Sequence, residues 1–298
     1  MFWNFSFDFV VVSVITSHRE KKLFSRRVFG TLVLLAAILS CSLKGQNPKS
    51  SHCSSASAAD FQSTPSSSQS AFGYDRPVSW KSIVPNILCD QKAIWLFPTE
   101  VGTHRNWIPT LSIAGATAGL FMLDPSEGKY FHQTSTFQEF NEAFTSKATV
   151  MATIVAPVSL YAAGLLRKDP KMQNTALLTG EAVVDAEIVT TVLKDIDRRA
   201  RPVTFTPHGN YWDSWFEDRG SPLRGDGSFP SGHTIAAFAI ATVIAHRYRT
   251  HRWVPYVCYG MASLVGFSRM SLSAHFASDV FVGAALGYSI SRFAVLRY

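Results

Sequence analysis

Seven apolar stretches, separated by polar loops, run through the chain from residue 109 to residue 293 and limit the folds that it can adopt. They are Pro109–Leu123, Phe137–Phe144, Ala148–Leu166, Asn174–Ile196, His233–Tyr248, Val254–Phe267 and His275–Phe293. Their pattern is helical, and the strict alternation of a half-buried strand is scarce. Small residues, as in Ala162–Gly164 and Gly283–Ala285, let helix backbones approach closely. We therefore predict an all-α fold, a compact helical bundle.

Composition and charge narrow the class of protein further. The chain is 47% hydrophobic and 16% charged, whereas an average chain is about 25% charged. This excess indicates many apolar helices or a membrane setting. Of the net charge of +7, five charges belong to residues 1–50, which hold seven Lys/Arg and two Asp/Glu. The rest of the chain has no clustered basic stripe, so binding to nucleic acid is not predicted.

The N-terminus has the pattern of an export segment. Five basic residues come first: Arg19, Lys21, Lys22, Arg26 and Arg27. The apolar run Val28–Leu39 that follows has the length of a signal-peptide core. Ser25–Phe29 resembles a twin-arginine signal and Ile38–Cys41 a lipoprotein cleavage box, so Cys41 could carry lipid. Residues 1–43 are predicted to be an export signal or, alternatively, an uncleaved membrane anchor.

Two further segments follow the export segment. Residues 44–80 are rich in Ser and poor in apolar residues, which predicts a flexible linker. Residues 81–298 are predicted to form the helical domain. The spacing of the four cysteines matches no zinc motif. Cys53 and Cys89 could form a disulfide in an oxidising compartment.

The sequence leaves two membrane arrangements open. Ala148–Leu166 is close to the roughly 20 apolar residues that a membrane span needs. Asn174–Ile196, however, carries Glu181, Asp185 and Glu187, and lipid tolerates such charges poorly. We therefore expect a bundle tethered by its N-terminus, with an integral membrane bundle as the alternative.

Two short motifs offer groups that bind phosphate oxygens. Lys194 and Arg201 are seven residues apart, so two helical turns place them on one face. The planar fork of Arg and the point charge of Lys both suit a phosphate. Ser231 can cap a helix that begins near His233, and Gly232 lets the backbone approach an anion there. Alone, each motif also fits a structural role, either a solvated basic face or a capped helix.

A third motif pairs a histidine with a carboxylate. His275 and Asp279 are four residues apart, the spacing at which two side chains share one face of a helix. Asp279 can accept from one ring nitrogen and leave the other nitrogen as a nucleophile. Arg269 lies just upstream, where it could reach the same phosphate. Alone, the pair also fits a structural His–Asp contact.

Taken together and in this order, the motifs resemble the type 2 phosphatidic acid phosphatase (PAP2) superfamily. The family signature is K-x6-R-P, then P-S-G-H, then S-R-x5-H-x3-D. The chain matches every position with Lys194-x6-Arg201-Pro202, Pro230-Ser231-Gly232-His233 and Ser268-Arg269-x5-His275-x3-Asp279. The resemblance implies a helical bundle of PAP2 type from about residue 105 to residue 298.

The resemblance also implies a chemistry for these residues. It predicts a phosphoric ester hydrolase that uses no metal and no cofactor and forms a phosphohistidine. His275 would attack phosphorus, Asp279 would orient it, and His233 would protonate the leaving oxygen and then activate water. The implied phosphate-binding residues are Lys194, Arg201, Ser231, Gly232 and Arg269. Phosphoryl transfer depends mostly on positioning and charge stabilisation, which three fixed cations can supply.

Four functions compete at this stage. A phosphatase acting on a lipid phosphate or pyrophosphate is favoured, and an acid phosphatase for soluble phosphomonoesters is the main alternative. A vanadate-dependent haloperoxidase, which has a similar anion site, is less favoured because those proteins are typically longer. An anion-binding scaffold is disfavoured because a binder needs no oriented nucleophile. The expected partners are a phosphate ester and a membrane, and the expected location is the cell envelope with the site outside the cytoplasm.

Overall fold

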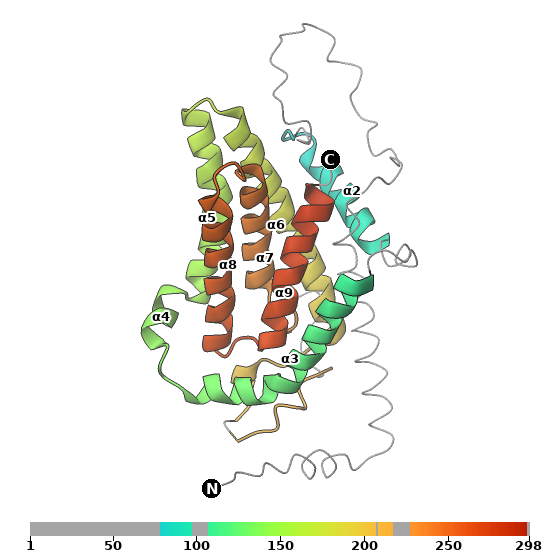
Figure 1. Ribbon diagram of the computed structural model, residues 1–298, viewed down its shortest axis with the longest axis vertical. Helices are drawn as coiled ribbons and strands as arrows, with labels where there is room; N and C mark the ends of the chain where they lie inside the picture. Colours follow the sequence, from blue (N-terminus) through green and yellow to red (C-terminus); the bar gives the residue numbers. More distant parts are fainter. Residues whose placement is uncertain (1–77, 97–106, 207, 217–226, 297–298) are drawn as a thin grey trace, which may run out of the picture.

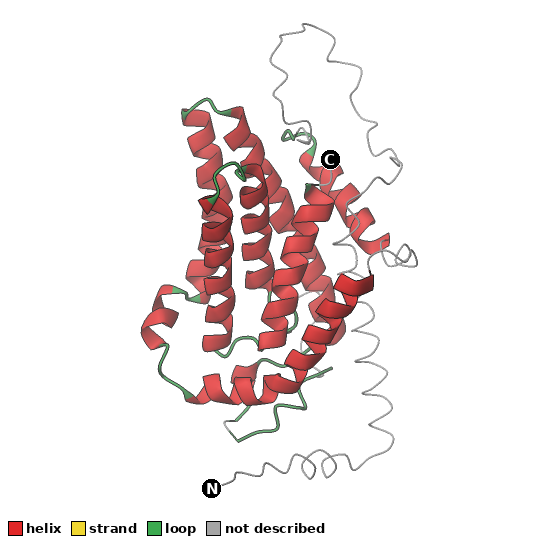
Figure 2. Cartoon of the chain, in the orientation of Figure 1, coloured by secondary structure: helices red, strands yellow, loops and turns green. Residues whose placement is uncertain are grey.

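Helices joined by loops make up the described part of the computed structural model, which comprises residues 78–96, 107–206, 208–216 and 227–296. No strand occurs within these ranges (Figure 2), so the predicted all-α class is confirmed. The helices are α2 (Ile83–Leu96), α3 (Trp107–Gln133), α4 (Gln138–Ala143), α5 (Ser146–Leu166), α6 (Pro170–Asp197), α7 (Gly232–Arg247), α8 (Trp253–Ser271) and α9 (Ala277–Ser289). A 3-10 turn covers Pro202–Thr204, and a π-helix, Ile290–Val295, continues α9. The predicted export segment and most of the predicted linker lie outside the described residues.

Helix α7 lies at the centre of the bundle and packs against α5, α6, α8 and α9 (Figure 1). Its buried face repeats every four residues, at Ile235, Ala239 and Val243, as expected for an amphipathic helix. Small residues bring α9 very close to α7, because a Cβ at Gly287 would overlap the carbonyl oxygen of Ile235. The predicted role of small residues in close packing is therefore seen at this contact.

Several helix boundaries differ from those that the sequence predicted. Helix α3 continues ten residues beyond the predicted end at Leu123, through Pro125, and passes beneath the bundle (Figure 1). Helix α9 begins at Ala277 rather than at His275. Helix α2 was not predicted, because its sequence mixes apolar and polar residues without a clear apolar stripe. Val78, in the stretch expected to be linker, is buried in the core.

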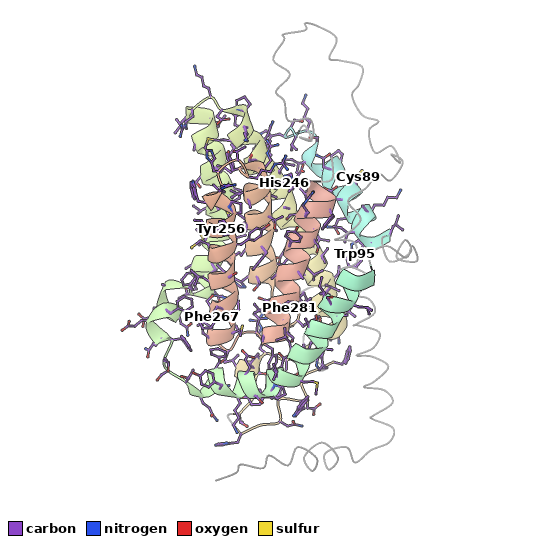
Figure 3. All side chains as sticks on the ribbon, viewed as in Figure 1. Cys89, Trp95, His246, Tyr256, Phe267 and Phe281 are labelled. Atoms are coloured by element: carbon purple, nitrogen blue, oxygen red, sulfur yellow. The ribbon has the colours of Figure 1, made fainter. Side chains whose placement is uncertain are left out.

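Helix α2 covers two carboxylates of α6. Asn86 Nδ2 donates to Glu181 Oε1 at 2.9 Å, and Gln91 Nε2 donates to Asp185 Oδ1 at 2.9 Å. Both carboxylates are buried inside the protein. For these two residues the sequence argument against a membrane setting therefore no longer holds, whereas Glu187, the third residue of that argument, is exposed. Cys89 on the same helix (Figure 3) is disulfide-bonded. The expected partner, Cys53, lies outside the described residues, so this pairing stays a prediction.

The outer faces of α5 and α8 are strongly apolar. Helix α5 is long and apolar enough to cross a membrane, and it is the one such helix among the described residues. Only 11% of its most apolar window is buried, unlike a core helix of a soluble protein. Large apolar side chains are exposed along both helices: Val150, Met151, Ile154, Val155 and Val158 on α5, and Trp253, Tyr256, Val257 and Met261 on α8 (Figure 3).

Candidate active site

The three motifs come together at one end of the bundle, which we call the site end. The last turns of α6 and α8 and the first turns of α7 and α9 meet there, next to α3 (Figure 1). Lys194 comes from α6, His233 from α7 and Arg269 from α8, while His275 precedes α9. Because consecutive helices run in opposite directions, motifs that are 28 and 35 residues apart in the sequence reach the same place.

His275 is buried, and one of its ring nitrogens is held by the backbone. Its Nδ1 lies 2.5 Å from the carbonyl oxygen of Ser228, which can only accept, so Nδ1 carries the proton. Asp279 Oδ2 lies farther away, at 3.7 Å from the same nitrogen. The carbonyl oxygen of Ser228 is therefore the nearer acceptor, and the role of Asp279 in orienting His275 stays a prediction. Burial lowers the pKa of His275 from 6.5 to about 4, against the opposing effect of Asp279. The ring is thus neutral at pH 7.

Asp279 occupies the first turn of α9 and is fully buried. Its Oδ2 accepts from the backbone N–H of Phe276 at 2.8 Å and from Ser228 Oγ at 2.6 Å. Asp279 and His275 do not share a helix face, because His275 lies before the helix begins. Their spacing of four instead reflects a helix-capping geometry, in which a carboxylate in the first turn satisfies a free N–H.

Lys194 and Gly232 lie next to each other, which joins the first two motifs. A Cβ at Gly232 would lie 3.2 Å from Thr190 Cγ2 and 3.9 Å from Lys194 Nζ. Lys194 is buried, whereas Arg201 is half-buried. The positive charges of Lys194 and Arg201 both help to lower the pKa of His275. Among the described residues, no group of three or more His, Cys, Asp or Glu side chains is arranged to hold a metal ion.

Ser231 and His233 begin α7 as expected, with one difference. Ser231 stands at the N-cap position, but its side chain makes no capping hydrogen bond; its Oγ instead lies 2.9 Å from Thr234 Oγ1. The backbone N–H of Ser231 donates to the carbonyl oxygen of Asp279 at 3.1 Å, which links α7 to α9. His233 Nε2 is buried and has no hydrogen-bond partner within the described ranges. His233 lies within electrostatic range of Arg269, His275 and Lys194.

The guanidinium of Arg269 is already engaged by protein groups. It donates to Ser146 Oγ at 3.0 Å, to Ser268 Oγ at 2.8 Å and to the carbonyl oxygen of Phe144. Its side chain therefore ties the end of α8 to the start of α5. Its charge still reaches His233. Arg269 therefore holds the local fold at the site end as well as placing a positive charge there.

Three residues of the site were missed by the sequence analysis. Ser228 contacts both His275 and Asp279, and its position two residues before Pro230 of the Pro-Ser-Gly-His motif was the one available signal. Arg199 is buried and donates to Asp279 Oδ1 at 2.5 Å and to Asp124 Oδ2 at 2.7 Å. The solvated basic face that the sequence left open for the first motif does not fit the buried Arg199, and no sequence pattern marked Asp124.

Comparisons with known proteins agree with the motifs. Residues 175–298 match the family model of the PAP2 superfamily. The lipid A 1-phosphatase of Porphyromonas gingivalis (strain ATCC 33277) is 46% identical over 75 residues. That match covers 24% of this chain and 17% of the relative, so the aligned part is a small share of the relative's length. No solved structure matches.

Proposed function

We propose that the protein is a phosphatase that hydrolyses a phosphate ester through a phosphohistidine on His275. The observation that carries the proposal is the bond from His275 Nδ1–H to the carbonyl oxygen of Ser228. It leaves Nε2 with a free lone pair. Because burial lowers the pKa of His275 to about 4, that lone pair is available at neutral pH. A buried, neutral imidazole with one fixed tautomer is suited to nucleophilic attack.

The proposed reaction has two steps. His275 Nε2 attacks phosphorus, and the bond to the leaving oxygen breaks as His233 Nε2 gives that oxygen a proton. A water then gives its proton to His233 and attacks the phosphohistidine, which releases inorganic phosphate and restores His275. Lys194, Arg201 and the N-terminus of α7 would stabilise the charge on the transferred group. The unpartnered Nε2 of His233 supports its role, because a buried polar atom without a partner is rare.

We further propose that the substrate is a lipid phosphate or pyrophosphate. The partial similarity to a lipid A 1-phosphatase supports this class. The exposed apolar faces of α5 and α8 support it independently, because a patch of that kind commonly marks a membrane contact. The exposed apolar side chains of α5 include Val150 and Met151, which lie near the start of this helix, at the site end. The phosphate of a membrane lipid would be presented there.

The same faces favour the integral arrangement over the tethered one. We propose that α5 crosses the membrane, because it is the one helix of the described part that is long and apolar enough to do so. At the end of the bundle away from the site, the exposed basic residues are Arg167, Lys168, Lys171, Arg249 and Arg252. At the site end, the exposed residues of the described part include three basic and three acidic ones: Lys129, Lys147, Arg198, Glu139, Glu142 and Asp213. Since basic loops stay in the cytoplasm, the site would face outward, as expected for an envelope enzyme. Release from membranes by carbonate would contradict this arrangement.

Release of inorganic phosphate tests the proposed function. The purified protein would be given lipid phosphates in detergent and soluble phosphomonoesters, with a chelator present. We expect lipid substrates to be preferred and His275→Ala to reduce phosphate release by at least 10³-fold while the thermal transition is retained. Substantial turnover by a folded His275→Ala protein would refute the nucleophile. Preference for soluble esters would favour the acid phosphatase, and bromide oxidation with vanadate would favour the haloperoxidase.

A further inference from the structure

Arg199 lies between two motif cations but is bonded differently from either. Its guanidinium is buried and donates to Asp279 Oδ1 at 2.5 Å, to Ser278 Oγ at 2.8 Å and to Asp124 Oδ2 at 2.7 Å. Its Nε donates to Ser214 Oγ at 3.3 Å. Every nitrogen of the guanidinium therefore has a protein acceptor, so Arg199 is not placed to bind a substrate phosphate.

Aromatic rings fix the plane of this guanidinium. The Arg199 Cζ lies 4.1 Å from the ring centre of Phe276 and 4.4 Å from that of Trp215. Both rings supply a cation–π contact, and both exclude water from the ion pairs. A lysine at this position would keep the charge but lose the fork and most of the stacking.

Asp124 fixes Arg199 from the side opposite Asp279. It comes from α3, and its Oδ1 accepts from the backbone N–H of Ser278 at 3.1 Å, while its Oδ2 accepts from Ser278 Oγ at 2.5 Å. The first turn of α9 is thus bonded to α3 both directly and through Arg199. Asp124 and Asp279 are 155 residues apart in the sequence, and this contact joins them around one cation.

Asp279 needs this cation because it has no access to water. Its exposed fraction is 0%, and an unpaired carboxylate at such a depth takes up a proton rather than stay charged. With Oδ1 bound to Arg199, the other oxygen remains an acceptor for Ser228 Oγ and Phe276 N–H. That oxygen also faces His275 Nδ1 at 3.7 Å, so its negative charge favours the Nδ1–H tautomer.

We infer that Arg199, anchored by Asp124, is a positioning residue that keeps Asp279 ionised and thereby holds His275 in the tautomer with a free Nε2. The inference rests on the proposed function, in which His275 is the nucleophile. It assigns to α3 a part in the reaction although α3 carries none of the three motifs. Arg199 acts on the substrate only through Asp279, Ser228 and His275.

Arg199→Lys tests the inference, with Arg198→Lys as the matched control. Arg198 is the neighbouring residue but is exposed, and its Nε bonds only the carbonyl oxygen of Asp195. We expect Arg199→Lys to lower kcat by 10- to 100-fold and to leave KM and the Ki of inorganic phosphate within threefold. The pH below which kcat/KM falls should rise by at least one unit, because Asp279 then takes up a proton more easily. Arg198→Lys should behave as the wild type.

Two kinetic outcomes would overturn the inference. Equal kcat for folded Arg199→Lys and Arg198→Lys would show that the ion pair is not needed. A weakened Ki for phosphate would show that Arg199 binds the substrate directly. If Arg199→Lys does not fold, Asp124→Asn replaces it, since the amide keeps the size and one acceptor of the carboxylate. For Asp124→Asn we expect a 3- to 10-fold loss of kcat, and the pH below which kcat/KM falls should rise as in Arg199→Lys. Wild-type kinetics would count against the inference.

The tautomer of His275 provides a readout that does not depend on turnover. Imidazole ¹⁵N NMR of the full chain, with His275 assigned by a His275→Gln variant, should show one tautomer protonated at Nδ1. Arg199→Lys should show a mixture, and an unchanged spectrum would overturn the inference. A wild-type protein with a fixed tautomer but no phosphatase activity would refute the proposed function and leave the positioning role standing.

Discussion

The contact between α7 and α9 leaves no space for a side chain at Gly287, which gives a sharp stability prediction. A Cβ there would overlap the carbonyl oxygen of Ile235 and lie 3.0 Å from Phe238 Cβ and 3.1 Å from Ala239 N. Two of these three atoms belong to the backbone of α7, so no rotamer change can relieve the overlap. Gly287→Ala must therefore push the two helices apart.

The cost can be compared with a control glycine. Overpacking a close contact destabilises the folded state by about 1–3 kcal/mol. Replacing a helical glycine by alanine stabilises it by about 0.5–1 kcal/mol. A Cβ at Gly180 on α6 would meet nothing within 4 Å, so Gly180→Ala should gain the second amount alone. The free energies of unfolding of the two variants should differ by about 1–3 kcal/mol, which corresponds to about 3–10 °C in Tm for a domain of this size.

Thermal unfolding in detergent and phosphate release would both be measured on the two variants. Because α9 carries Asp279 and α7 carries His233, separating the helices should also lower kcat for Gly287→Ala by about tenfold, since small displacements of reacting groups are costly. Gly180→Ala should keep its activity. Equal Tm and equal kcat for the two variants would refute the close-contact argument.

Two further predictions concern ions and pH. Activity should survive EDTA and be inhibited by vanadate, because Lys and Arg side chains, and not a metal ion, are proposed to bind the phosphate. A loss of activity in EDTA that magnesium restores would contradict this prediction. Glu127 has its pKa raised from 4.5 to about 8, first by burial and then by the charge of Asp124. The folded protein therefore holds a proton that the unfolded chain releases, and stability should fall by a few kcal/mol as pH rises from about 5 to about 8. Glu127→Gln should flatten this dependence in thermal unfolding, and an unchanged slope would argue against the raised pKa.

The fold class and the motif residues could be predicted because their signals are local. A helical apolar period requires only neighbouring residues, and each motif is shorter than 13 residues. Boundaries were less predictable, since the apolar run ends at Leu123 whereas α3 continues through Pro125 to Gln133. The spacing of His275 and Asp279 suggested a shared helix face, whereas the helix begins between them. Sequence spacing therefore indicated that the two side chains lie close together, at 3.7 Å, but not how the backbone brings them there.

Arg198 and Arg199 show why the rest could not be predicted. The two residues are identical and adjacent, yet Arg198 is exposed and Arg199 is buried. Arg198 ends α6 with a left-handed backbone, at a φ of 42°, and this turn directs the next side chain inward. The charge of Arg199 is tolerated there only because Asp124 and Asp279 arrive from α3 and α9. The partners that distinguish a buried cation from a surface one are therefore set by tertiary packing, and no pattern within the motif carries that information.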